Sequence, residues 1–259
     1  MASSPSSDTA AAPAGLDGVL VAFGNLVFRY RNALAPVLLG VILLLTRPRP
    51  FFGSTALDPL WDVAGVLVAL AGQVLRILVI GLAYIQRGGK NRTIAADKLV
   101  VEGIFAHVRH PLYVGNFLLL TGLMMIWNAP GGYAVLALAG LALFSMARAE
   151  EVFLSRKFGP EFDDFCARVP RFIPNVRGLR ATMARFSFDW KRVVRKEYGT
   201  TFAFASCALA LIALQWTQWE GLNGFWHAVA TLLPVWLVVV AAWATARWMK
   251  KTGRLASPD

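Results

Sequence analysis

Charged residues are scarce in this chain, and their scarcity excludes an ordinary soluble domain. Asp, Glu, Lys and Arg together make up 16% of the 259 residues, whereas soluble domains hold about 25%. Hydrophobic residues reach 57%, so long stretches of the sequence carry no charge. This composition predicts an integral membrane protein.

Several signatures of other protein classes are also missing. The two cysteines, Cys166 and Cys207, fall in a predicted loop and a predicted span, so no disulfide is expected. No Cys/His spacing suits zinc, and no metal site is expected. The sequence has neither a Gly-x-Ser-x-Gly nucleophile motif nor a phosphate-binding glycine loop. Residues 1–18 lack the basic start of a secretory signal and are predicted to be disordered.

The hydrophobic runs predict an all-α fold, a polytopic bundle of about six transmembrane helices. A helix rises about 1.5 Å per residue, so about 20 apolar residues cross the hydrocarbon core. The first run is the shortest, and the sixth contains Pro234, which a membrane helix tolerates. The predicted spans are residues 33–45, 61–85, 112–127, 133–149, 202–219 and 225–249.

Basic residues concentrate in alternate loops. With a cytosolic N-terminus, 23 of the 26 Lys and Arg lie in inner segments, two lie in outer segments, and Arg76 lies inside the second span. This asymmetry is the positive-inside signature. Both termini are therefore predicted to be cytosolic, and the net charge of +11 needs no nucleic-acid partner. The Ala- and Arg-rich composition is typical of a bacterial protein, which indicates the cytoplasmic (inner) membrane.

Proline and glycine divide the chain into segments. Residues 128–132 separate the third span from the fourth, and Gly159-Pro160 ends the helix that continues the fourth span. Residues 161–168 then predict a short cytosolic amphipathic helix. The predicted segments are a cytosolic tail (1–32), a short span and loop (33–59), a central module (60–176), a basic interfacial segment (177–200) and a two-helix membrane extension (201–259).

Two polar clusters lie next to predicted spans. Arg109-His110-Pro111 begins the third span, and Glu150-Glu151 follows the fourth. Because the chain crosses the membrane and returns between them, both clusters are expected at the same face. Each has a plain structural explanation, as an interfacial helix start and as a solvated acidic pair. Two carboxylates at a helix C-terminus, where cations are favoured, nevertheless indicate ligand binding.

Arg76 lies near the middle of the second predicted span, where an arginine costs about 2.5 kcal/mol or more. Gln73 lies one turn away on the same helix face. Two explanations stay open: Arg76 pairs with a buried acid or backbone carbonyls, or it faces a substrate.

In combination, these motifs resemble the isoprenylcysteine carboxyl methyltransferase family and its phospholipid methyltransferase relatives. The resemblance covers the central module, about half the chain. It implies an integral membrane methyltransferase that uses S-adenosylmethionine in a cytosolic pocket over the helical hairpin. The acceptor would be a lipid or lipidated small molecule from the bilayer. The matching stretches are residues 99–105, 108–115, 148–154, 158–162 and 168–174.

The resemblance also implies roles for individual residues. The residues expected to bind the cofactor are Lys98, Leu99, Val100, Phe105, His110, Pro111, Tyr113, Gly115 and Glu150. The residues expected to be catalytic are Arg109, His110, Glu151 and Arg171.

The acceptor and the reaction class stay open. A carboxylate acceptor is already ionised at pH 7, whereas an amine must lose a proton, for which His107 and Glu151 are candidate bases. One alternative to the methyltransferase is an NADPH-dependent, sterol-type membrane reductase with related helical architecture. The other is a non-enzymatic membrane protein in which these residues anchor helices.

Overall fold

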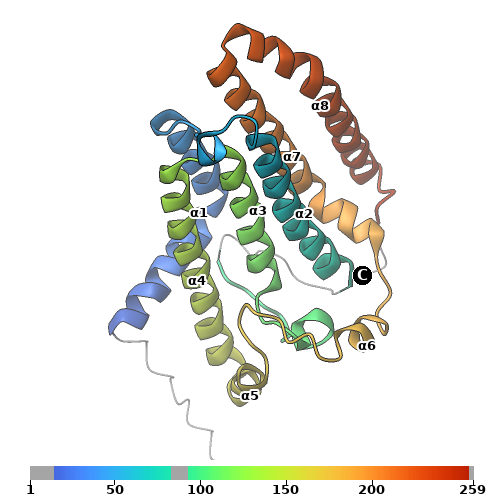
Figure 1. Ribbon diagram of the computed structural model, residues 1–259. Helices are drawn as coiled ribbons and strands as arrows, with labels where there is room; N and C mark the ends of the chain where they lie inside the picture. The colour runs from blue at the N-terminus through green and yellow to red at the C-terminus, as the bar shows by residue number, and fades with distance from the viewer. Residues whose placement is uncertain (1–14, 83–92, 257–259) are drawn as a thin grey trace, which may run out of the picture.

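The computed structural model describes residues 15–82 and 93–256, and in this part the chain forms eight α-helices (Figure 1). Two 3-10 turns, η1 (Phe51–Gly53) and η2 (Gly103–Ala106), lie in the connections. The helices are α1 (Gly15–Leu45), α2 (Asp58–Leu82), α3 (Pro111–Trp127), α4 (Pro130–Phe158), α5 (Pro160–Arg168), α6 (Leu179–Met183), α7 (Trp190–Glu220) and α8 (Leu222–Lys251).

The predicted all-α membrane fold is confirmed, but the count of six spans is not. Four helices of the described chain, α2, α4, α7 and α8, are long and apolar enough to cross a membrane. A fifth span exists if the two halves of α1, which meet at an angle of 69° near Pro36, count as one. Helix α3 is apolar but has 17 residues, which gives a length of about 26 Å against a hydrocarbon core of about 30 Å.

Helix ends follow the proline and glycine signals. Asn128 ends α3 in the left-handed conformation with φ 43°, and Pro130 starts α4 two residues later. Gly159 ends α4 with φ 56°, directly before Pro160 at the start of α5. Glycine adopts positive φ readily, and proline suits the first helical turn. Both predicted breaks are therefore confirmed, and α3 and α4 form a tight hairpin.

Helices α2 and α3 pack closely through glycines. A Cβ on Gly72 would lie 2.6 Å from the carbonyl oxygen of Gly115. About two helical turns away, Gly65 and Gly122 approach each other in the same way. Small residues let membrane helices approach backbone to backbone. The contact brings Arg76 against Gly115, so Gly115 belongs to a helix interface.

Two predicted boundaries differ from the structure. Helix α1 begins at Gly15, so residues 15–32 are helical where the sequence predicted a tail; Val27 and Phe28 are buried there against Met146 of α4. Helix α7 runs unbroken from Trp190, so no helix boundary separates the predicted interfacial segment from the extension. The predicted disorder of residues 1–14 and the end of the second predicted span at 83–85 lie outside the described residues.

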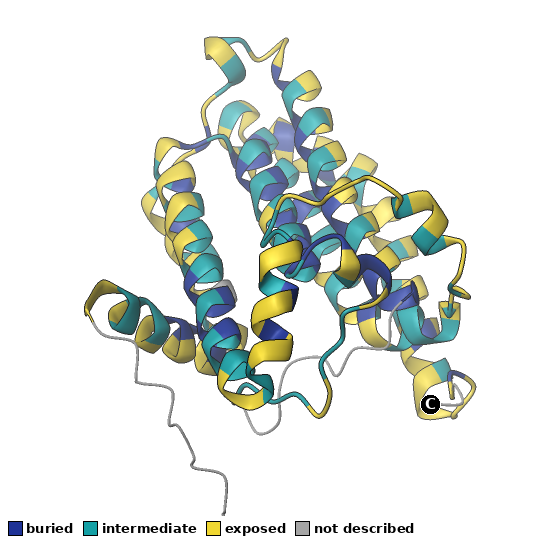
Figure 2. Cartoon of the chain, turned by 90° about the horizontal axis from the view of Figure 1, so that it is seen from below, coloured by how far each residue is buried: buried dark blue, intermediate teal, exposed yellow. Residues whose placement is uncertain are grey.

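The helices stand side by side, with α5 and α6 at one end and α8 at the outer edge beside α7 (Figure 1). Viewed from the α5 and α6 end, many buried residues face the middle of the bundle, and exposed residues lie mainly on outward-facing helix surfaces (Figure 2). Helix α8 is apolar, yet only 6% of its most apolar window is buried. An apolar helix with so little protein contact faces lipid.

Candidate active site

A cavity of about 710 Å³ lies where α3 begins and α4 nears its end. Its wall is assembled from distant parts of the chain: α1, α2, the segment 94–100, η2, α3, α4, α5 and the first turns of α7. Residues 15–32, predicted to be a tail, therefore contribute to this wall through Phe28, Arg31 and Asn32.

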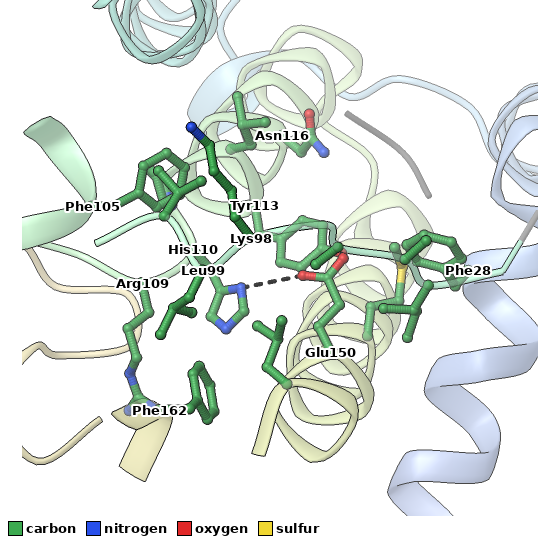
Figure 3. Close-up of a pocket in the computed structure, with 18 of the residues that line it drawn as sticks. Phe28, Lys98, Leu99, Phe105, Arg109, His110, Tyr113, Asn116, Glu150 and Phe162 are labelled. Carbon is green, nitrogen blue, oxygen red and sulfur yellow. Dashed lines mark hydrogen bonds and ion pairs between the residues drawn. The ribbon is translucent and has the colours of Figure 1, made fainter. Parts of the chain in front are cut away.

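The α3–α4 hairpin brings the two predicted polar clusters together (Figure 3). Nδ1 of His110 lies 3.5 Å from the Glu150 carboxylate, and Nε2 lies 3.2 Å from Glu151. The hydroxyl of Tyr113, one turn into α3, donates a hydrogen bond of 2.6 Å to Glu150. Figure 3 shows His110 and Glu150 pointing toward each other across the cavity wall. The imidazole and the two carboxylates thus share one end of the bundle, as the sequence predicted.

Backbone pairing fixes the segment that carries His110. The amide of Arg109 donates to the carbonyl of Pro170 at 2.9 Å, and the amide of His110 donates to the carbonyl of Arg171 at 3.1 Å. A further bond of 2.9 Å runs from the amide of Asn175 to the carbonyl of His107. The extended stretch between Pro170 and Asn175 therefore holds the start of α3 in place and delivers the Arg171 side chain.

Glu151 is surrounded by cations. Its side chain is only 3% exposed and accepts two hydrogen bonds from Arg171, at 2.9 and 2.6 Å. Arg109 lies 2.8 Å from the same carboxylate, and Arg148 lies 3.6 Å from it. A buried carboxylate is stable only when it is paired and hydrogen-bonded, and these groups provide that pairing.

The two carboxylates favour the charged form of the His110 ring. Burial acts to lower the pKa of His110, but the hydrogen bonds and charges of Glu150 and Glu151 outweigh it and raise the pKa above 6.5. In that form the ring can donate through both nitrogens, one to each carboxylate. His110 therefore joins the two acidic residues at the start of α3.

Most of the residues predicted to bind or react line the cavity, but three do not. Gly115 lies in the α2–α3 interface, and Glu151 and Arg171 form the ionic cluster behind the wall. The predicted residues on the wall are Lys98, Leu99, Val100, Phe105, Arg109, His110, Pro111, Tyr113 and Glu150.

His107, a candidate base in the sequence analysis, lies away from the wall. Its Nδ1 is 2.6 Å from the carbonyl oxygen of Asn175, and its Nε2 is 3.0 Å from the hydroxyl of Thr182. Both nitrogens are used in joining the start of α3 to the segment around α6. The geometry gives His107 a structural role.

Several cavity residues were missed by the sequence reasoning. Arg76 from α2 and Lys196 from α7 both line the cavity. The charge of Arg76 within a span was a usable signal. Arg76 pairs with the buried acid Glu197, as the first of the two open explanations expected, and it also lines the cavity. Lys196 lies in a segment outside the family resemblance, so no motif marked it.

Comparison with known proteins, together with the apolar helices, supports a membrane enzyme of the methyltransferase class. Residues 61–161 match the model of the phospholipid methyltransferase family. The protein-S-isoprenylcysteine O-methyltransferase of Schizosaccharomyces pombe is 34% identical over 115 residues, which are 40% of this chain and 46% of that enzyme. The chain thus spans less than half the length of that relative.

Two bacterial relatives are covered more fully. The nickel-cobalt-cadmium resistance protein of Alcaligenes xylosoxydans xylosoxydans is 31% identical over 173 residues, 66% of this chain and 74% of that protein. The cobalt-zinc-cadmium resistance protein of Cupriavidus metallidurans is 31% identical over 173 residues, 65% of this chain and 75% of that protein. No solved structure matches the chain. The chain belongs to the isoprenylcysteine carboxyl methyltransferase-like family of membrane methyltransferases.

Proposed function

We propose that this protein transfers a methyl group from S-adenosylmethionine to a lipid or lipid-like acceptor at the cytosolic face of the membrane. The observation that carries the proposal is the Glu150 carboxylate on the cavity wall, held by the hydroxyl of Tyr113 and the ring of His110. The family membership supports methyl transfer over the reductase alternative. The basic residues of the loops at this end support a cytosolic location.

The size and the lining residues of the cavity suit S-adenosylmethionine. The cavity volume of about 710 Å³ lies within the range of about 300–1,000 Å³ typical of small-molecule sites. Glu150 would bind the ribose or the amino group, and the backbone of residues 98–100 would hold the adenosine end. The bound cofactor supplies an activated methyl group on a sulfonium.

The protein's own contribution is alignment and the exclusion of water. Tyr113 and His110 hold Glu150 in one orientation before any ligand binds, so little rearrangement is needed on binding. Phe162 and Phe165 of α5 pack over the cavity from the loop side. These apolar side chains shield the reacting groups from water.

The site favours an acceptor that needs no proton removed. Among the described residues that line the cavity, the one histidine, His110, is committed to the two carboxylates. Tyr113 already donates to Glu150. Glu151, the other candidate base, is enclosed by guanidinium groups behind the wall. A carboxylate, which is ionised at neutral pH, suits this site better than an ammonium group.

Labelling with methyl-tritiated S-adenosylmethionine tests the proposal. Purified protein in nanodiscs would be supplied with N-acetyl-S-farnesylcysteine as a lipidated carboxylate or with phosphatidylethanolamine as a lipid amine. We expect label in the carboxylate acceptor that mild base releases as methanol, since methyl esters hydrolyse and N-methyl groups do not. Base-stable label in phosphatidylethanolamine would shift the assignment to the amine.

Cofactor binding is the second arm of this test. Calorimetric titration should show binding of S-adenosylmethionine to the native protein and its loss in Glu150→Gln. Binding that is undiminished in this variant, or undetectable in the native protein, refutes the proposed function.

A further inference from the structure

A buried ion pair connects the central module to the C-terminal helices beside the cavity. Arg76 of α2 and Glu197 of α7 have side chains 3% and 2% exposed. Nε and Nη2 of Arg76 each donate a hydrogen bond of 2.9 Å to Glu197, one to each carboxylate oxygen. This two-pronged geometry is the most directional pairing available to a guanidinium.

Neighbouring polar groups complete the arrangement. Nη1 of Arg76 donates to the side-chain oxygen of Asn116 on α3. Gln73, one turn earlier on α2, donates to Glu197 at 3.3 Å and to the hydroxyl of Thr201 at 2.9 Å. Three helices therefore converge on one guanidinium. Burying a charged side chain within a membrane span is costly, and charged residues that are retained there with polar partners are usually functional.

Among residues 15–82 and 93–256, the partners of the Arg76 guanidinium position it without using all of its donors. Arginine has five N–H groups, and three of them are engaged by Glu197 and Asn116. Arg76 and Asn116 both line the cavity, and so does Lys196, the residue before Glu197. The cavity thus has cationic groups from α2 and from α7 on its wall, while Glu197 is not part of the wall.

This group lies deeper along the helices than the Glu150 site. Asn116 is three residues further into α3 than Tyr113, which is about 4.5 Å along the helix axis. Arg76 is six residues, about 9 Å, before the end of α2. The Glu150 end of the cavity is thus nearer the loops, and the Arg76 end lies deeper within the apolar helix α2.

We propose that Arg76, Asn116 and Lys196 bind the anionic group of the methyl acceptor, a carboxylate or a phosphate, and that Glu197 is the positioning residue for Arg76. The inference rests on the proposed function, because it names the acceptor's place in the same cavity. It makes α7 part of the active site, although α7 lies outside the region that matches the family. The first turns of α7 then help to determine which acceptors the enzyme accepts.

Binding of simple amphiphiles tests this subsite directly. Dodecanoate, dodecyl phosphate and dodecyltrimethylammonium have the same length of hydrocarbon tail and differ in the head group. Each would be titrated calorimetrically into protein in phosphatidylcholine nanodiscs, with empty nanodiscs as the blank. We expect saturable binding of an anion and none of the cation, and the tighter of the two anions identifies the carboxylate or the phosphate.

The variants are Arg76→Gln and Glu197→Gln, with Thr201→Val as the matched control from the same cluster. Losing one hydrogen bond to a charged group weakens binding by about 10- to 100-fold, and we expect that loss in both Gln variants but not in the control. S-adenosylmethionine binding should be unchanged in all three. Anion affinity that is equal in native and Gln variants, or no anion binding by the native protein, overturns the proposal.

A charge exchange separates positioning from folding. The double variant with Arg76→Glu and Glu197→Arg restores an ion pair between α2 and α7 but places the acid at the cavity. We expect the double variant to recover the thermal stability that Arg76→Glu alone or Glu197→Arg alone loses, while anion binding stays lost. Recovered anion binding would show that the pair is merely structural. Native protein that binds the anion but not S-adenosylmethionine would refute the proposed function and leave this subsite intact.

Discussion

The adjacent acids Glu150 and Glu151 should respond very differently to the same change. Glu151→Gln removes the one negative charge that Arg109 and Arg171 share, in a side chain that is 3% exposed. Removing one partner of a buried ion pair costs about 3–5 kcal/mol. The lower end, about 3 kcal/mol, applies because the side chain of Arg171 is 27% exposed. For a chain of this size that corresponds to a fall in Tm of about 6–12 °C.

Glu150→Gln is the matched comparison. Its side chain is 26% exposed, and an amide oxygen still accepts the hydrogen bond from Tyr113, so we expect little change in Tm. Thermal unfolding in detergent, followed by tryptophan fluorescence, measures both variants, and calorimetry measures S-adenosylmethionine affinity. Glu151→Gln should lose stability, and Glu150→Gln should lose cofactor binding. Equal Tm values for the two variants, or a larger fall in Glu150→Gln, would refute the division of roles.

Three further predictions concern single contacts. The folded-state pKa of His110 is raised above 6.5, so the stability that its imidazolium contributes is fully present below pH 6.5 and is lost as pH rises through the folded pKa. We expect the Tm of the native protein to fall over this window and the Tm of His110→Gln to change less with pH. Gly72→Ala places a methyl 2.6 Å from a carbonyl oxygen of α3 and should cost about 1–3 kcal/mol, whereas Gly199→Ala meets nothing within 4 Å and should not lower Tm. Tyr113→Phe removes the donor to Glu150 and should weaken cofactor binding about tenfold, with unchanged affinity counting against its role.

The sequence predicted the features that local chemistry determines. Pro130 and Gly159 marked helix ends because proline suits a first turn and glycine tolerates positive φ. The period of the aromatic residues in 161–168 predicted α5, whose Phe162 and Phe165 are indeed buried. The meeting of His110 with Glu150 followed from counting residues across one hairpin. Each of these inferences needed only neighbouring residues or a single turn of the chain.

The partner of Arg76 could not be predicted in the same way. Glu197 is 121 residues away, and several other acids along the chain were equally plausible partners. The pairing depends on how α7 packs against α2, which no local pattern specifies. The contribution of α1 to the cavity was missed for a similar reason, since it depends on how α1 packs against α4 through Val27, Phe28 and Met146.

The helix itself explains why Glu150 and Glu151 have separate tasks. Consecutive residues on an α-helix point about 100° apart, because 3.6 residues complete a turn. Glu150 faces the cavity, and the side chain of Glu151 points into the protein beside it and is 3% exposed, where a lone carboxylate would be prohibitively costly. The guanidinium groups of Arg109 and Arg171 remove that cost, and the ring of His110 contacts both carboxylates. The ionic cluster around Glu151 thus supports the placement of the Glu150 carboxylate at the cavity, and weakening the cluster should loosen the binding site.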